Sequence, residues 1–300
     1  MIDAKEREWD ALGSNHVGIL FDSLNWKIDR IGFQQEDLRA LLKAHTKIKN
    51  ELDEIVMDLK MYRKIDVKKT KDLSSALESL SYHRFETHFR GWQEEVKKRQ
   101  EIYLKYFKGK KNVLDLGCGR GEFLEILKEN GIESYGIDLN DEMVQVCKEK
   151  GIKCVKADIL EHLLSIDDES LGGIFSSQVI EHLEPNYLQK LIGTAFVKLK
   201  SDSYLILETI NPKSLFALSE IFSRDFTHRK PVHPETLKFL LESAGFGDIE
   251  IIYLSEVGEK QRLKEIPEDD ERFRIISDNF RKINNILFGF VDYAIVGLKK

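Results

Sequence analysis

The 300-residue sequence lacks several features that would assign it to a class of protein at once. It has no apolar run approaching the ~20 residues of a membrane-spanning helix, and its first ten residues, MIDAKEREWD, contain no signal-peptide core. It also has no basic excess, since its formal net charge is −6, whereas a general nucleic-acid binder needs a clustered basic surface. These absences predict a cytoplasmic protein with no membrane span and no nucleic-acid partner.

Cysteine is scarce as well. The chain has three, Cys118, Cys147 and Cys154, an odd number without the spacing of metal ligands. We expect them to be reduced thiols and expect no metal ion. Cys118 lies between two glycines, where a small residue fits a turn, so we interpret it as structural rather than catalytic.

Proline is absent from residues 14–80, and from Leu24 the apolar residues recur every seven positions. One core-type position holds Leu24, Ile31, Leu38, His45, Leu52 and Leu59, and the other holds Ile28, Gln35, Leu42, Lys49, Val56 and Arg63. This repeat predicts a coiled coil or a long-helix bundle. We therefore divide the chain into a helical arm, residues 1–75, and a second domain, residues 76–300. The arm can pack on its own domain, self-associate or dock on a partner.

From Lys111 onward, predicted strands and helices alternate. Strands are expected at 112–117, 134–139, 154–159, 172–180, 203–210, 249–255 and 292–300, and helices at 122–130, 141–151, 186–200 and 236–245. Such alternation predicts an α/β fold, with a parallel sheet covered by helices on both faces. In these sheets ligands bind beyond the carboxyl ends of the strands.

The stretch VLDLGCGRGEF, residues 113–123, places Gly117, Gly119 and Gly121 where the first strand should pass into a helix. Because glycine inside an element costs roughly 0.5–1 kcal/mol against alanine, the three glycines indicate a tight turn or a backbone lying against a ligand. The spacing is G-x-G-x-G, not the G-x-G-x-x-G of dinucleotide-binding folds. A nicotinamide dinucleotide and a turn without a ligand stay open as alternatives.

Two acids follow the next two predicted strands. Asp138 ends the second strand, where its carboxylate can accept both hydrogen bonds of a ribose diol. Asp158 follows the third strand, placed to accept from an exocyclic amine, with Ile159 beside a flat base. Together with the glycines, these acids predict a nucleoside-containing ligand.

Four stretches, DLGCGRG (115–121), GIDLN (136–140), ADIL (157–160) and SQVIEHL (177–183), together resemble the class I S-adenosylmethionine-dependent methyltransferases. The resemblance implies a Rossmann-like, mostly parallel seven-stranded sheet whose last strand is antiparallel. It also implies that IEHL faces the reactive centre. The S-adenosylmethionine-binding residues that it implies are Asp115, Gly117, Gly119, Gly121, Asp138, Leu139, Asp158, Ile159 and Gln178.

A finer resemblance rests on FRGWQEEVKKRQEIYLKYF (89–107) and on the segment from ETINPKSLF to LLESAGF (208–246). With the heptad-bearing N-terminus, these are similar to methyltransferases of surface-polysaccharide assembly, including those that cap O-antigen chains, although no kinase-like segment is present. The resemblance implies a glycan acceptor, and a glycosyltransferase partner or self-association through the arm. Related ubiquinone-type O-methyltransferases place an arginine before the first strand to bind the cofactor carboxylate, and Arg99 and Arg90 are the candidates.

Methyl transfer to a hydroxyl needs positioning and a base that removes the proton. The imidazole candidates are His182, His228 and His233, with Glu181, Glu208 and Asp225 as nearby acids. We favour His228, because His233 precedes a proline suited to the first turn of a helix. His182 is the reserve.

We therefore predict O-methylation of a sugar hydroxyl on a glycan or glycolipid precursor. The alternatives are methylation of a small molecule such as a quinone-like phenol, and a non-catalytic adaptor that keeps the cofactor pocket. Specificity is expected in residues 211–235 and 256–291, because long excursions in a compact α/β domain are usually binding loops or lids.

Overall fold

The computed structural model of the chain describes residues 49–50, 93–264 and 271–300. Residues 93–264 and 271–300 lie in one compact unit, Arg90–Lys300. The predicted arm, apart from Lys49 and Asn50, lies outside the described residues, as does Arg90.

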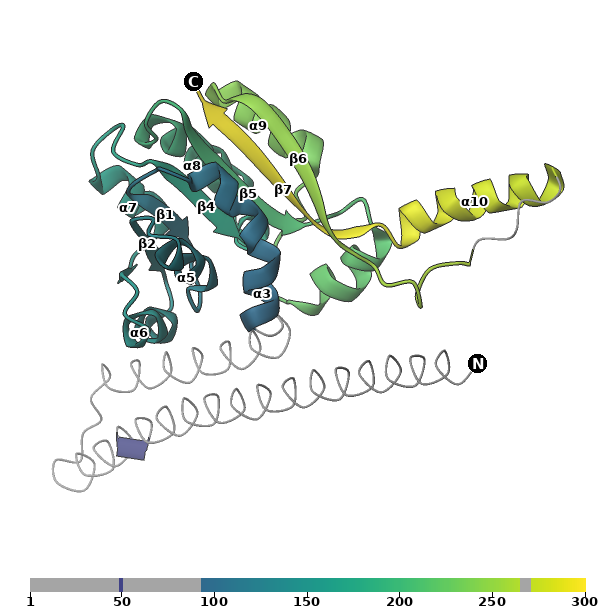
Figure 1. The fold of residues 1–300 in the computed structure, drawn as a ribbon, viewed down its shortest axis with the longest axis horizontal. Helices are drawn as coiled ribbons and strands as arrows, with labels where there is room; N and C mark the ends of the chain where they lie inside the picture. Colours follow the sequence, from purple (N-terminus) through teal and green to yellow (C-terminus); the bar gives the residue numbers. More distant parts are fainter. Residues whose placement is uncertain (1–48, 51–92, 265–270) are drawn as a thin grey trace, which may run out of the picture. The chain divides into compact units, whose positions relative to one another are not determined.

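Within the described residues, the strands form one seven-stranded sheet of order β3-β2-β1-β4-β5-β7-β6 (Figure 1). The strands are β1 (Val113–Leu116), β2 (Ser134–Asp138), β3 (Cys154–Lys156), β4 (Gly173–Ser177), β5 (Ser203–Ile210), β6 (Gly247–Glu256) and β7 (Phe290–Lys299). The first five pair in parallel, and β7 runs antiparallel between β5 and β6. The predicted Rossmann-like sheet with an antiparallel last strand is confirmed.

Four described helices follow the predicted ranges closely: α5 (Glu122–Glu129), α6 (Asp141–Glu149), α8 (Pro185–Lys198) and α9 (Pro234–Ala244). Four others had no predicted range: α3 (Gln93–Gln100), α4 (Leu104–Phe107), α7 (Ile159–Ser165) and α10 (Glu271–Leu287). The predicted third strand ends early because the Asp158 carboxylate caps α7, and residues 256–291 contain the helix α10.

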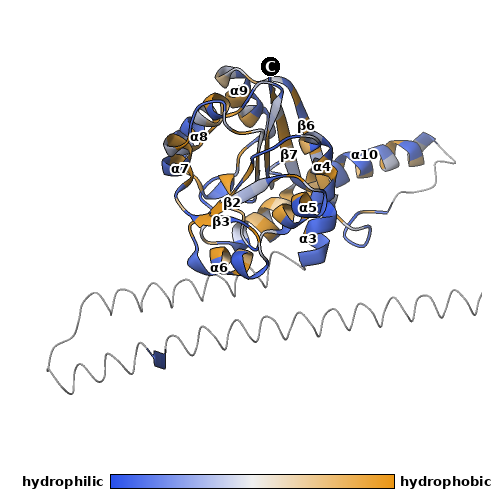
Figure 2. Ribbon diagram, turned by 60° about the vertical axis from the view of Figure 1, so that its left-hand side comes forward, coloured by the Kyte–Doolittle hydropathy of each residue, from blue (hydrophilic) through white to orange (hydrophobic). Residues whose placement is uncertain are grey.

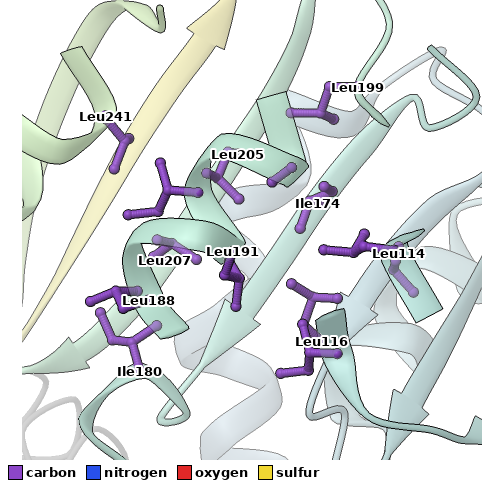
Figure 3. Close-up of a cluster of buried hydrophobic side chains, with 14 of the residues drawn as sticks. Leu114, Leu116, Ile174, Ile180, Leu188, Leu191, Leu199, Leu205, Leu207 and Leu241 are labelled. Atoms are coloured by element: carbon purple, nitrogen blue, oxygen red, sulfur yellow. The ribbon is translucent and has the colours of Figure 1, made fainter. Parts of the chain in front are cut away.

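Two apolar layers sandwich the sheet. On one face α7, α8 and α9 pack on strand residues such as Leu116 and Leu207 (Figure 3). On the other face Tyr103, Phe107 and α5 pack on residues such as Phe175. Each fully buried large apolar side chain contributes about 1.5–3 kcal/mol, so both layers fix the strand ends that carry the site.

The hydropathy colouring in Figure 2 shows apolar residues gathered along the sheet and on the inner sides of the helices. Among the described residues, no helix is long and apolar enough to cross a membrane. Between β5 and α9 the chain forms two short turns, Ala217–Ile221 and Phe222–Arg224, before reaching α9. These turns carry part of the site described next.

Candidate active site

The site gathers at the carboxyl ends of β1, β4 and β5, which are neighbours in the sheet. Asp115 in β1 lies opposite Phe175 in β4, and Ser177 in β4 lies opposite Glu208 in β5. Asp115 itself is buried within β1. Residues that follow these strands are therefore brought to the same edge, as parallel pairing requires.

The glycine turn links β1 to α5 with a backbone that other residues adopt at a cost. Gly117, Gly119 and Gly121 have φ values of 68°, 52° and 82°, the left-handed region that favours glycine. A Cβ on Gly117 would lie 2.5 Å from Cγ2 of Val179, the residue after Gln178. The predicted tight turn is present, and glycine at position 117 also lets the turn pack closely against Val179.

Asp138 ends β2 and is bonded to this turn. Its Oδ2 accepts a 2.9 Å hydrogen bond from the Gly119 N–H, and its Oδ1 accepts one of 2.8 Å from the Asn140 N–H. A carboxylate oxygen can accept more than one hydrogen bond, so Asp138 is chemically suited to accept from a ribose diol. The next residue, Leu139, is 65% exposed and offers an apolar surface beside the carboxylate.

Asp158, which was predicted to accept a hydrogen bond from an exocyclic amine, has a structural role in the fold. Its Oδ1 accepts from the N–H groups of Leu160 and Glu161 and so caps α7. The Tyr187 hydroxyl lies 2.9 and 2.8 Å from its two oxygens. Ile159, predicted to flank a base, is buried at the start of α7. Tyr187 was not anticipated, because it comes from α8, 29 residues further along the chain.

Gln178 begins the segment after β4 with a φ of 57°, uncommon for a residue with a side chain. Its N–H donates to the Glu208 carbonyl, and its side-chain amide donates to Oδ1 of Asp292 at 3.1 Å. Non-glycine residues held in this region cluster at functional sites.

Asp292 in β7 and Glu208 in β5 form a buried acid pair. Burial, and then the charge of Glu208, raise the pKa of Asp292 to about 6. Glu208 accepts hydrogen bonds from the Tyr103 hydroxyl at 2.5 Å and the Ser177 hydroxyl at 2.8 Å. Asp292 was not predicted as a site residue, because it lies within a mostly apolar strand and matches no motif.

Arg99 on α3, one of two arginines predicted to bind a carboxylate, is placed beside this pair. Its Nη1 lies 3.4 Å from the Ser255 hydroxyl and 3.7 Å from Oδ2 of Asp292. The structure therefore brings Arg99 and Gln178, both predicted cofactor residues, to the same carboxylate. The residues that contact Arg99, Ser255 and Asp292, lie on β6 and β7.

On the opposite face of the sheet, Glu181, His182 and His228 meet. Glu181 is fully buried and accepts a 2.9 Å hydrogen bond from the Thr209 hydroxyl of β5. The rings of His182 and His228 lie 4.7 Å apart between centroids. The predicted clustering of histidines from two post-strand segments is thus present for these two residues.

The hydrogen bonds of both histidines fix which ring nitrogen carries the proton. Nδ1 of His228 lies 2.7 Å from the Phe222 carbonyl, which can only accept. Nδ1 of His182 lies 3.0 Å from the Thr227 hydroxyl, whose proton is donated to Asp225 at 2.5 Å. In the neutral rings both Nε2 atoms therefore carry a lone pair.

Asp225 and His233, the two other candidates discussed for catalysis, lie beside the histidine pair and at the start of α9, respectively. Asp225 Oδ2 lies 3.8 Å from Nε2 of His228, close enough to stabilise a protonated ring. His233 caps α9, because its Nδ1 accepts from the Glu235 N–H at 3.2 Å. The expected role of His233 at the start of a helix is confirmed.

Glu181, His182 and His228 can each offer one ligand atom, and these atoms lie within 4.8 Å of one another. A carboxylate with two imidazoles is a donor set that divalent cations accept. The sequence predicted no metal ligands here, because His228 is 46 residues beyond His182.

Comparisons with known proteins relate this chain to methyltransferases. A family model described as a methyltransferase domain matches residues 84–251. The crystal structure of an S-adenosylmethionine-dependent methyltransferase from Archaeoglobus fulgidus is 47% identical, with a TM-score of 0.71, and the match covers 73% of this chain and 99% of that one. The YcgJ protein of Bacillus subtilis shares the fold, with a TM-score of 0.50, 18% identity, and coverage of 69% of this chain and 99% of that one.

A curated relative is the mitochondrial ubiquinone biosynthesis O-methyltransferase of Bos taurus, which is 32% identical over 151 residues. That match covers 44% of this chain and 40% of the bovine protein, so it spans less than half of either.

Proposed function

The chain belongs to the methyltransferase-domain family, and from this premise we propose that it transfers a methyl group from S-adenosylmethionine to a hydroxyl group of its acceptor. The observation that supports a hydroxyl acceptor is the pair of imidazoles, His182 and His228, whose ring centroids lie 4.7 Å apart. They stand at the carboxyl edge of the sheet, on segments that follow β4 and β5.

S-adenosylmethionine supplies an electrophilic methyl group on a sulfonium when bound, and the residues present fit it. The glycine turn has a left-handed backbone at Gly117, Gly119 and Gly121, and it lies beside Asp138, so a nucleoside bound to this carboxylate would lie close to the turn. Asp138 can accept the ribose diol, and the exposed Leu139 offers an apolar surface to the adenine.

The methionine end of the cofactor carries an ammonium and a carboxylate. Nη1 of Arg99 lies 3.7 Å from Oδ2 of Asp292, so the pair offers one positive and one negative group. The side-chain amide of Gln178 donates a hydrogen bond to the same aspartate. A zwitterion can exchange partners with such a pair without leaving a buried charge uncompensated. This is our proposed role for Arg99.

His228 acts as the base in this proposal. Its Nδ1–H is held by the Phe222 carbonyl, so Nε2 takes the proton of the acceptor hydroxyl. Asp225, 3.8 Å away, then stabilises the imidazolium. Since the pKa of a sugar hydroxyl lies well above that of a phenol, which is about 10, a sugar acceptor depends on this base more strongly.

Two acceptor classes follow from different observations. The surface-polysaccharide resemblance of the sequence supports a sugar hydroxyl on a glycan or glycolipid precursor. Similarity to the bovine ubiquinone biosynthesis O-methyltransferase supports a small quinone-like phenol. Phe226, 84% exposed and two residues before His228, gives either ring a flat apolar surface.

The deciding experiment is transfer of radiolabelled methyl groups to matched panels of glycan precursors and catechol-type phenols. Labelled O-methyl ethers in one panel assign the acceptor class. Label only on amines would overturn the hydroxyl proposal.

A second role for the same cluster rests on its donor set. Glu181, His182 and His228 could hold a divalent cation that orients and acidifies the acceptor hydroxyl. Loss of transfer on chelation, with rescue by an added divalent cation, would favour this role over that of a free base.

The heptads of residues 24–63 remain our basis for proposing self-association, or docking on a glycosyltransferase, through the N-terminal arm.

A further inference from the structure

The three cysteines of the chain meet at one point beside the glycine turn, and the proposed methyl transfer uses none of them. Cys118 lies in the glycine turn, Cys147 near the end of α6, and Cys154 at the start of β3. All three are buried and free of disulfide bonds. Their three Sγ atoms lie within 4.8 Å of one another, and those of Cys118 and Cys154 are 3.3 Å apart.

The backbone makes room for this convergence. Gly136 in β2 lies between Asp115 of β1 and Cys154 of β3 in the sheet. A Cβ on Gly136 would lie 2.5 Å from Sγ and 2.7 Å from Cβ of Cys118. Only a glycine at this position lets Cys118 fold across β2 toward Cys154.

The cluster also touches the cofactor-binding turn. Sγ of Cys147 donates to the Gly119 carbonyl at 3.3 Å, and the N–H of Gly119 donates to Asp138. A ligand bound to the thiols would therefore hold the peptide segment that orients Asp138.

We propose that Cys118, Cys147 and Cys154 form a binding site for one thiophilic d¹⁰ cation, Zn²⁺ or Cu⁺, that braces the glycine turn. Thiolates are the preferred ligands of both ions. With metal–sulfur bonds of about 2.3 Å, three sulfurs around one cation stand ~4 Å apart, so small shifts from the present spacing suffice. Each thiol that ligates releases its proton to solvent, and no oxidation is involved.

The cluster supplies three sulfur ligands from three separate segments of the described chain. No fourth histidine, cysteine or carboxylate joins the group among the described residues, so Zn²⁺ would need water or a carbonyl as its fourth ligand, whereas Cu⁺ would not.

The test uses the full chain, kept anaerobic with a phosphine reductant and titrated with Cd²⁺, whose thiolate complexes absorb in the ultraviolet. Zn²⁺ and Cu⁺ are then added separately as competitors. We expect native mass spectrometry to show one cation per chain. Of Zn²⁺ and Cu⁺, the ion that displaces Cd²⁺ at the lower free concentration is the one that the site prefers. Cys147→Ser and Cys154→Ser should each weaken binding by more than ~100-fold.

The matched control is His228→Ala, which breaks the second potential cation cluster found among the described residues and should leave the thiolate absorption unchanged. Binding lost in His228→Ala but kept in Cys154→Ser would overturn the proposal, as would no thiolate absorption at saturating Cd²⁺. If the serine variants do not fold, X-ray absorption of the Zn²⁺-loaded wild type decides. Three sulfur neighbours support the site, and a shell of nitrogen and oxygen alone contradicts it. Each outcome is independent of methyl transfer, so it leaves the proposed function to its own test.

Discussion

The two ends of the site are built in different ways. The cofactor end, which we define as residues 115–121, 138–140 and 158–160, is held by backbone groups bonded to nearby carboxylates, as in the bonds from Gly119 and Asn140 to Asp138. The acceptor end, residues 181–182, 209 and 222–228, is assembled by side chains from three separate segments, as in the contact between His182 and Thr227. The proposed cofactor end thus rests mainly on backbone hydrogen bonds, whereas the acceptor end depends on contacts between side chains that are distant in sequence.

The largest expected effect is a loss of the rate of methyl transfer without a loss of cofactor affinity. His228→Gln keeps a polar side chain but removes the basic Nε2, and should lower kcat by roughly 10²–10⁴-fold, the usual range for general-base removal. Cofactor affinity should stay near wild type, because His228 contacts only the acceptor end. Single-turnover methyl transfer and calorimetry measure the two quantities. His233→Gln is the matched control, and it should affect the start of α9 rather than the rate.

At the cofactor end, Asp138→Ala should weaken S-adenosylmethionine binding by roughly 1–3 kcal/mol, the cost of losing hydrogen bonds to a charged group. It also frees the Gly119 N–H, which Asp138 now holds. Asp138→Asn keeps an accepting oxygen and should lose less. Equal affinities of wild type and Asp138→Ala in calorimetry would remove Asp138 from the cofactor site.

Asp292, beside Arg99 at the proposed methionine end of the cofactor, should make the stability of the fold depend on pH. The pKa of Asp292 is raised from 3.8 to about 6 in the folded chain, so the folded state holds this proton more tightly than the unfolded state. Stability should therefore fall as pH rises from about 4 to about 6, by on the order of 1–3 kcal/mol, and stay lower above that. Asp292→Asn should flatten this part of the denaturation profile. An unchanged profile in the variant would show that Asp292 does not hold this proton.

The smallest effect on the site is expected from the predicted arm. Deleting residues 1–75 should leave cofactor affinity unchanged, because the heptad pattern is separate from the α/β pattern. Light scattering should show a smaller assembly if the arm self-associates. An identical mass per particle, after allowing for the deletion, would leave docking on another protein as its role.

The same contrast explains what the sequence could predict. The glycine turn and Asp138 follow from local spacing, and the parallel pairing of the first five strands follows from connection rules that leave few choices. Asp292 and Thr227 carry no local signal, because their roles depend on which residues β7 and the 222–228 turn bring beside them. Asp158 lies between these cases, since it was found by position but its capping of α7 competes with the third-strand pattern.

The meeting of His182 and His228 was anticipated only as a cluster on two segments. Their tautomers depend on the Phe222 carbonyl and the Thr227 hydroxyl, which no spacing rule reveals. Arg99 shows the same limit, because the residues that it faces, Ser255 and Asp292, lie more than 150 positions away.

The central claim is that cofactor binding and acceptor activation reside in separate ends of one site. The most direct test measures single-turnover methyl transfer at saturating cofactor, together with cofactor affinity, in wild type, Asp138→Ala, His228→Gln and the double variant. We predict that Asp138→Ala changes affinity while leaving the saturated rate close to wild type, that His228→Gln changes the rate alone, and that the double variant shows both losses independently. A His228→Gln variant that keeps the wild-type rate, or an Asp138→Ala variant whose saturated rate falls as far as that of His228→Gln, would contradict the account.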